Sequence, residues 1–172
     1  MLLVVVIWGG LPPVGKSALQ MVDPYWITAM RFGAAACVFL ILLWLREGRG
    51  ALNAEGQFKK IALFGAFGFA GFGITLFEGL RLTRPEIAAM ILALGPIQVA
   101  IFQWWQTRQR PDNFTLAAIA IALIGEAFVL TSGDITRLSG GDALGNGLVF
   151  VASLFWTAYT LGGQQFPGWS PV

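Results

Sequence analysis

Long apolar blocks separated by short polar segments divide the chain of 172 residues. An α-helix rises about 1.5 Å per residue, so about 20 apolar residues cross a hydrocarbon core of about 30 Å. By this measure the pattern predicts an all-α, polytopic membrane protein with about six transmembrane helices. The expected spans cover approximately residues 2–20, 25–45, 61–80, 87–105, 114–130 and 143–161.

The composition agrees with this pattern. Hydrophobic residues make up 56% of the chain and charged residues 12%, and the mean hydropathy is +0.71. A soluble domain has about 25% charged residues, so this chain could not cover a soluble surface and its expected partner is the lipid bilayer. The net charge of +2 comes from short basic clusters between apolar blocks, which does not indicate a nucleic-acid surface.

A nucleotide-binding loop is a remote alternative. An apolar run at residues 3–7 precedes four positions that fit the P-loop pattern G-x-x-x-x-G-K-[ST], namely Gly10, Gly15, Lys16 and Ser17. A nucleotide-binding core also needs an acidic residue at the end of an apolar strand, and the nearest candidate, Asp134, follows a span too long for a strand. We therefore predict that the protein is not an enzyme and has no catalytic residues.

Metal and disulfide chemistry are not indicated either. The chain has no histidine and one cysteine, Cys37, inside an apolar run. This excludes a disulfide framework and a zinc site of the usual Cys/His spacing. We predict no metal site and no cofactor.

Helix-breaking residues interrupt two of the predicted spans. The first contains Gly9, Gly10, Pro12 and Pro13, and the fourth contains Gly95 and Pro96. Unwound backbone at membrane depth is tolerated where it lines a cavity, and transporters bind substrates and ions at such places. The third span is rich in glycine, which lets helix backbones approach closely in a membrane.

Ionisable residues inside the spans are candidates for the substrate pathway or for coupling. A charge at the centre of a membrane helix costs about 2.5–3.5 kcal/mol on insertion scales, so such residues usually face a bundle interior. Arg31 could instead form a structural pair with Glu78 or Glu126, and Lys16 could lie at the outer interface. The full set of candidates adds polar Gln98 and an aromatic pair one helical turn apart: Lys16, Arg31, Glu78, Gln98, Glu126, Trp156 and Tyr159.

The basic residues predict the orientation. With a cytoplasmic amino terminus, the inner loops hold six Lys or Arg residues and the outer loops hold four. Because positive charge concentrates on the cytoplasmic side, we predict that the amino terminus is cytoplasmic, in a bacterial inner membrane.

Four motifs in order resemble the EamA-type branch of the drug/metabolite transporter superfamily. Trp8-Gly9 followed by Lys16 is similar to the family's first helix, and Pro24 followed by Arg31-Phe32 is similar to its second. EIAAMILALGPIQVAIFQWW resembles the fourth helix, and GDALGNGLVFVASLFWTAYTLGG resembles the sixth, which opens the second repeat. One departure is Arg108-Gln109-Arg110, where the family often has a G-E-R turn.

The resemblance implies a transporter of about ten helices, built from two inverted repeats, that moves small metabolites such as amino acids. Residues 1–131 would form the first five-helix repeat, and residues 132–172 a loop and the first helix of a truncated second repeat. An alternating-access site lies between two repeats, so either the missing helices or a second copy of the chain would have to complete it. Completion by a second copy would resemble the dimers of the related small multidrug-resistance proteins.

Two functional hypotheses follow. The first is that the chain is the amino-terminal part of a permease for amino-acid-like or drug-like solutes. The second is a membrane fragment or assembly partner that does not transport, in which the charged side chains form only structural pairs.

Overall fold

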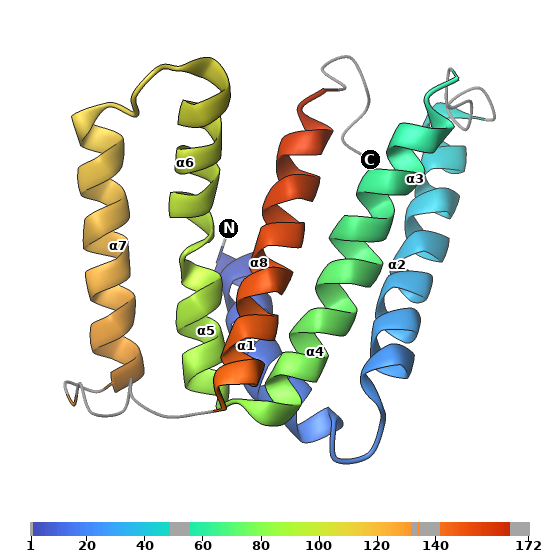
Figure 1. Cartoon of the computed structure of the whole chain (residues 1–172). Coiled ribbons are helices and arrows are strands. Elements are labelled where there is room, and N and C mark those ends of the chain that lie inside the picture. Colours follow the sequence, from blue (N-terminus) through green and yellow to red (C-terminus); the bar gives the residue numbers. More distant parts are fainter. Residues whose placement is uncertain (1, 49–55, 132–133, 135–141, 166–172) are drawn as a thin grey trace.

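A computed structural model of the chain describes residues 2–48, 56–131, 134 and 142–165. Within these ranges the chain is helical and contains no strand (Figure 1). The elements in chain order are α1 (Leu2–Ala18), α2 (Pro24–Glu47), α3 (Phe58–Gly65), η2 (Ala66–Gly71), α4 (Phe72–Leu82), α5 (Pro85–Ala93), α6 (Gly95–Thr107), α7 (Asn113–Thr131) and α8 (Ala143–Gly163).

The helices have the lengths and composition of a polytopic membrane protein. Four described segments are long and apolar enough to cross a membrane: Pro24–Glu47, Phe58–Leu82, Pro85–Thr107 and Ala143–Gly163. Helix α7 contributes a shorter apolar segment, Asn113–Val129, and α1 is a helix of 17 residues. The predicted all-α membrane fold is confirmed.

Local sequence signals set where the helices begin. The side chain of Asp23 accepts hydrogen bonds from the backbone N–H groups of Tyr25 and Trp26 at 2.9 and 3.0 Å, and Pro24 occupies the first turn of α2. Asp142 caps α8 in the same way. These contacts satisfy backbone N–H groups in the first turn that have no partner inside the helix. The two aspartates therefore mark the residues at which α2 and α8 begin.

Helix α1 continues without interruption through Gly9, Gly10, Pro12 and Pro13, so the predicted break in the first span is wrong. Two prolines remove two backbone donors, but the remaining bonds keep the helix intact. The P-loop alternative is wrong for the same reason. Its apolar run and its Gly15-Lys16-Ser17 segment lie in one helix, whereas a P-loop needs a strand followed by a loop.

The fourth span divides where the sequence predicts it. Helix α5 ends at Ala93, Leu94 has φ −70° and ψ −8°, and α6 begins at Gly95 with Pro96 in its first turn. Pro96 supplies no N–H for a continuous helical ladder. The two halves therefore form one span with a local change in backbone geometry at its centre.

The third span contains a π-helical segment that the sequence analysis did not predict. Element η2, at Ala66–Gly71, lies between α3 and α4. π-Helical turns are rare and often occur at functional sites. This segment brings Gly68 against the Tyr159 ring of α8, where an added Cβ would lie 2.3 Å from the ring carbon Cγ.

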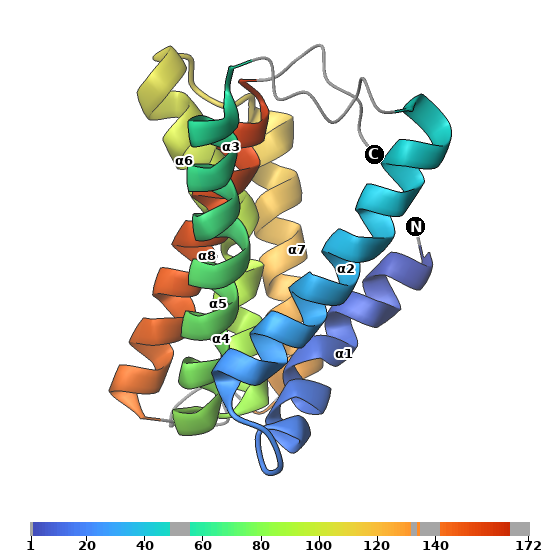
Figure 2. The same ribbon diagram turned by 90° about the vertical axis from the view of Figure 1, so that its right-hand side faces the viewer.

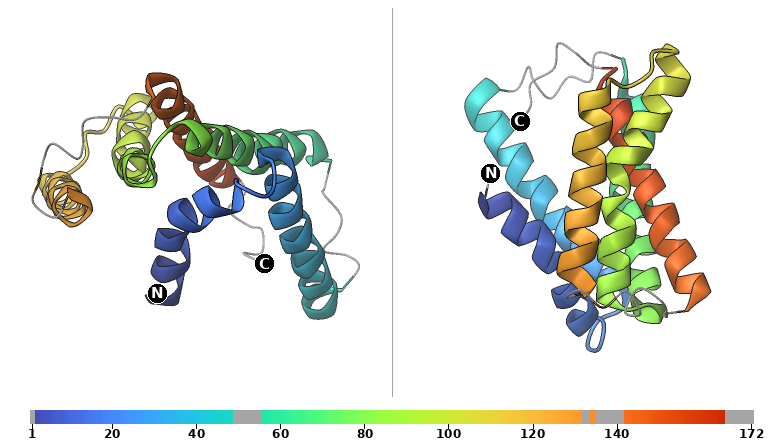
Figure 3. Two further views of the ribbon diagram at one scale, coloured as in Figure 1. Left: turned by 90° about the horizontal axis from the view of Figure 1, so that it is seen from below. Right: turned by 90° about the vertical axis from the view of Figure 1, so that its left-hand side faces the viewer.

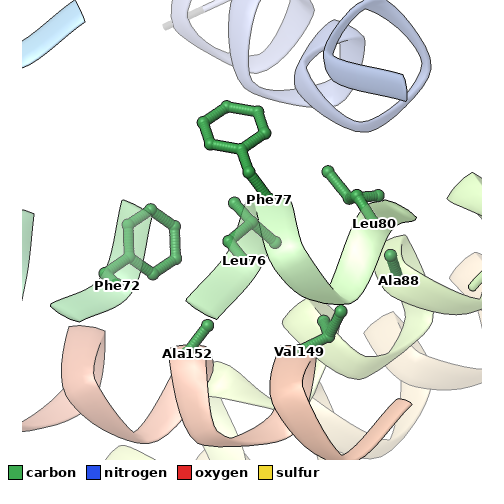
Figure 4. Packing of buried hydrophobic residues seen from close by; sticks show 7 residues of the cluster. All are labelled: Phe72, Leu76, Phe77, Leu80, Ala88, Val149 and Ala152. Carbon is green, nitrogen blue, oxygen red and sulfur yellow. The ribbon is translucent and has the colours of Figure 1, made fainter. Parts of the chain in front are cut away.

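The core lies mainly between α4 and α8, which make the most extensive contact in the described chain. Its buried side chains come from α4, α5 and α8 (Figure 4): Phe72, Leu76, Phe77, Leu80, Ala88, Val149 and Ala152. A Cβ on Gly79 of α4 would lie 2.9 Å from the carbonyl oxygen of Gly145 on α8. The glycines therefore permit the close backbone approach expected of membrane helices.

Helices α1 and α2 diverge from the rest of the bundle. In Figure 2 they lean away from α3 and α8 towards the upper end, and from below they project to one side of the other helices (Figure 3). The carboxyl ends of α2, α6 and α8 lie at the upper end of Figure 1, and those of α1, α4 and α7 at the lower end. Helix α7 lies at the edge of the bundle.

Candidate functional site

Lys16 contacts the carboxyl end of α4. Its Nζ donates hydrogen bonds to the backbone carbonyls of Leu80, Arg81 and Thr83 at 2.5, 2.9 and 2.9 Å. Carbonyls in the last turn of a helix have no partner within the helix, and a cation stabilises the negative end of the helix dipole. Lys16, which sequence analysis proposed for the substrate pathway, thus joins the carboxyl end of α1 to the carboxyl end of α4.

The same turn is joined to α8. The Thr83 hydroxyl donates a hydrogen bond to the side-chain oxygen of Asn146, and Thr83 is only 2% exposed. Together with Lys16, this bond connects three helices at the lower end. These contacts hold together the carboxyl ends of α1 and α4 and the amino end of α8.

Arg31 lies inside α2 without a carboxylate partner among the described residues. Its guanidinium carbon is 5.1 Å from the centroid of the Phe32 ring and 5.3 Å from that of Phe77. The structural pair with Glu78 or Glu126, which was the alternative to a pathway role, is not present among the described residues. Glu78 instead pairs with Arg81, one turn along α4, at 3.2 Å, which leaves Arg31 among aromatic rings.

Gln98 connects α6 to α8 just after the division of the fourth span. Its side-chain nitrogen donates to the Ser153 hydroxyl at 2.7 Å, and its oxygen accepts from the Thr157 hydroxyl at 3.0 Å. Both hydroxyl residues are buried, at 3% and 5% exposed. Sequence analysis singled out Gln98 but missed its two partners, whose one-turn spacing on α8 was the available signal.

Glu126 borders a cavity of about 300 Å³ between α5 and α7. The other lining residues are apolar: Met90, Ala93, Leu94, Leu123, Ile124 and Ala127. A second apolar cavity of about 290 Å³ lies between α6 and α7. Glu126 is thus close to the division of the fourth span, at Leu94, and the lining of its cavity includes neither Arg31 nor Lys16.

Trp156 and Tyr159 belong to an aromatic cluster that spans several helices. Trp156 lies 5.2 Å from Trp8 of α1 and 5.1 Å from Phe72 of α4, measured between ring centroids. Tyr159 lies 5.0 Å from Phe69 of η2. The cluster therefore joins the helix predicted to open the second repeat with three elements of the first.

Comparison with known proteins decides the family. The model of the EamA-like transporter family matches residues 1–131. The chain belongs to the EamA-like transporter family. It is 35% identical over 170 residues to the uncharacterized transporter YrdR of Bacillus subtilis strain 168, covering 96% of this chain and 53% of YrdR.

Other EamA-like relatives agree. The chain is 29% identical over 158 residues to the uncharacterized transporter YyaM of the same strain, covering 89% of this chain and 50% of YyaM. An uncharacterized transporter of Archaeoglobus fulgidus is 24% identical over 163 residues, covering 95% of this chain and 55% of that protein. The chain thus spans about half the length of the curated relatives it matches. No solved structure matches it.

Proposed function

We propose that this chain is part of a multi-pass permease that moves small metabolites, amino-acid-like or drug-like, across a bacterial inner membrane. In this proposal it supplies the first repeat and the opening helix of the second. Membership of the EamA-like family supports the transport activity. The half-length coverage of its relatives supports the view that further helices, or a second copy, complete the pathway.

The contact between Trp8 and Trp156 is the observation that carries the proposal. Substrates of inverted-repeat transporters bind near the membrane midplane, at the interface between repeats. Helix α8, the expected start of the second repeat, presents Trp156 to Trp8 at 5.2 Å and Tyr159 to Phe69 at 5.0 Å. Aromatic side chains that converge with few polar groups are typical of small-molecule sites.

The proposed orientation has a cytoplasmic amino terminus. The carboxyl ends of α2 and α6 lie at one end of the bundle, and Arg46, Arg108 and Arg110 occur in or next to them. Lys16 is engaged with backbone carbonyls at the other end. A cysteine placed before α3 and labelled from one side of intact cells with a membrane-impermeant maleimide tests this orientation.

Transport is tested by reconstituting the permease, together with the further helices or the second copy that complete it, in liposomes and measuring counterflow of a mixture of radiolabelled amino acids. We expect counterflow in the wild type and its loss in Trp156→Ala. Trp44→Ala is the matched control, because Trp44 is 51% exposed on α2. Equal loss in both variants, or no counterflow with any solute in the completed protein, would contradict the proposal.

Glu126 is the proposed coupling carboxylate, because it borders a cavity beside the divided span. Glu126→Gln should abolish the pH dependence of uptake while leaving membrane insertion intact. Glu78→Gln is the control, since Glu78 pairs with Arg81 near the end of α4. Unchanged uptake and unchanged pH dependence in Glu126→Gln would exclude the coupling role.

The alternative is a membrane fragment or assembly partner that does not transport. The contacts of Lys16 with α4 and of Gln98 with α8 favour it, because these polar groups are engaged in joining helices. The two functions differ in one readout. Under the alternative, replacing a charged residue lowers the amount of inserted protein and no solute flux exists to be affected.

The genomic sequence after the codon for Val172 tests the proposed half-length organisation. An open reading frame with further apolar spans would support it. A stop codon at that point would instead favour completion by a second copy, and crosslinking in native membranes would then be expected to capture a dimer.

A further inference from the structure

Two neighbouring polar groups on α2 are buried without a hydrogen-bond partner. They are the hydroxyl oxygen of Thr28 and the Nη1 nitrogen of Arg31. Thr28 is 5% exposed. Most buried polar side-chain atoms in proteins are paired, and an unpaired one costs about 1–3 kcal/mol, or more when charged. Two such groups in one place therefore indicate a missing partner.

Both groups lie on the face of α2 that packs on α4. They are three positions apart, so they share one side of the helix. Thr28 packs directly on Gly73 of α4, where an added Cβ would lie 2.5 Å from the Thr28 methyl carbon and 3.0 Å from its hydroxyl oxygen. Because Gly73 has no side chain, the Thr28 hydroxyl can lie between the two helices.

Two aromatic rings lie against the Arg31 guanidinium. Arg31 lies over Phe32 and Phe77, and Phe77 is itself 1% exposed and packs towards α1, where its Cε1 would lie 2.9 Å from a Cβ on Gly15. The rings offer the cation their π faces but no hydrogen-bond acceptor. The fork of N–H donors on Arg31 remains suited to an acceptor with two oxygens.

The charge of Arg31 is also not balanced locally. Among the described residues no carboxylate forms an ion pair with it, and Glu78, on the helix it faces, pairs with Arg81. Arg31 carries one positive charge, which a ligand with one negative charge would balance. This balance favours a carboxylate over a dianionic phosphate.

We propose that Arg31 and Thr28 form a subsite that binds the carboxylate of a solute. The guanidinium donates to the two carboxylate oxygens, the Thr28 hydroxyl donates to one of them, and the partly exposed Phe32 contacts the apolar part of the solute. The inference rests on the proposed transport function for its biological meaning. Binding itself is measurable on this chain without any transport.

The test is isothermal titration of the chain in nanodiscs of phosphatidylcholine, which has no net charge to compete for Arg31. The probe is phenylacetate, and phenylacetamide is its neutral counterpart of the same shape. We expect phenylacetate to bind, and the amide to bind about tenfold more weakly or not at all, because a charged hydrogen bond is lost. Equal binding of the two probes would overturn the proposal without any variant.

Variants locate the binding. Arg31→Gln should weaken phenylacetate binding about tenfold or more, and Thr28→Val, which keeps the shape of the side chain, about threefold or more. Arg46→Gln, at the exposed end of the same helix, should leave the affinity unchanged. Because Arg31→Gln removes a partly buried charge, each variant is first checked for wild-type helix content by circular dichroism.

Thr28→Val keeps the test decisive if Arg31→Gln does not fold. Unchanged affinity in a folded Thr28→Val, or in a folded Arg31→Gln, would overturn the subsite. Solute counterflow that does not depend on Arg31 would overturn the subsite alone and leave the proposed function in place. Binding that depends on Arg31, in a protein with no counterflow, would support the subsite and contradict the transport function.

Discussion

The ammonium nitrogen of Lys16 lies 2.5 Å from the carbonyl oxygen of Leu80, although 64 positions separate the two residues in the sequence. Two further carbonyls, from Arg81 and Thr83, lie within 2.9 Å of the same nitrogen. A single cation thus satisfies several acceptors at the end of a helix. In a membrane protein this contact joins the first and third spans by a polar bond at their base.

Replacing Lys16 with methionine should destabilise the protein. The substitution keeps an unbranched side chain but leaves up to three helix-terminal carbonyls without their donor, at a cost of about 1–3 kcal/mol. We expect a lower thermal unfolding midpoint in detergent micelles. Lys59→Met is the control, because Lys59 is exposed in the first turn of α3.

An unchanged midpoint in Lys16→Met would show that water or lipid headgroups replace the ammonium group at no cost. Lys16→Arg should retain most of the wild-type stability, since a guanidinium also donates to several carbonyls.

Gly79→Ala should disrupt the contact between α4 and α8. The new Cβ would lie 2.7 Å from Cγ2 of Val149 and 2.9 Å from the carbonyl oxygen of Gly145. Because backbone atoms cannot move aside as a side chain can, we expect a loss of about 1–3 kcal/mol of folding free energy. Unfolding in a mild detergent by titrated sodium dodecyl sulfate measures it.

Gly147→Ala is the matched control on α8. Nothing lies within 4 Å of a Cβ at that position, and alanine has the higher helix propensity. We expect a neutral or slightly stabilising effect. A similar loss of stability in both variants would refute the close backbone contact between α4 and α8.

The sequence predicted the helical spans well because membrane crossing imposes a simple requirement of length and apolar composition. It also located the division at Gly95 and Pro96, where a missing donor falls at mid-span. The same rule failed at Pro12 and Pro13, which α1 accommodates without interruption. Whether a proline ends a helix depends on the packing around it, which the sequence pattern does not contain.

The candidate site shows the same limit. The placement of Lys16 and Arg31 within helical spans could be predicted, but the groups that surround their side chains could not. The acceptors of Lys16 are backbone carbonyls, which every residue type supplies and no motif marks. The π-helical segment at 66–71 likewise has no local sequence signal; within it, Phe67 packs on Phe155 and Phe69 on Tyr159 of α8.

Gln98→Leu should loosen α6 from α8. The change removes the acceptor of the Thr157 hydroxyl and the donor to Ser153, while the Ser153 hydroxyl keeps its bond to the carbonyl of Phe150. Hydrogen bonds between membrane helices contribute about 0.6 kcal/mol on average and up to about 2 kcal/mol. We therefore expect a loss of folding free energy in that range.

Gln103→Leu controls for the substitution itself, because Gln103 is exposed on the same helix. The combined variant Ser153→Ala, Thr157→Val should lower the cost of Gln98→Leu if the three side chains act as a unit. Additive effects would contradict the described network.

The start of α7 should weaken at low pH. The backbone N–H of Thr115 donates to the Asp112 carboxylate at 2.6 Å, and hydrogen bonds from the side chain and backbone of Thr115 hold the pKa of Asp112 below its ordinary value of 3.8. Because the pKa is lower in the folded chain than in the unfolded one, the cap stabilises the helix above the unfolded-state pKa. This contribution is lost as the pH falls through the lowered folded-state pKa.

Asp112→Asn isolates this effect. Asparagine caps helices nearly as well as aspartate but has no charge to lose. Between about pH 5 and about pH 3, the range in which carboxylates titrate, the unfolding midpoint of the wild type should fall further than that of the variant. The difference between the two curves belongs to Asp112, since all other carboxylates are common to both proteins. Parallel curves would mean that this exposed cap does not contribute to folding stability, and that α7 begins where its apolar segment enters the membrane.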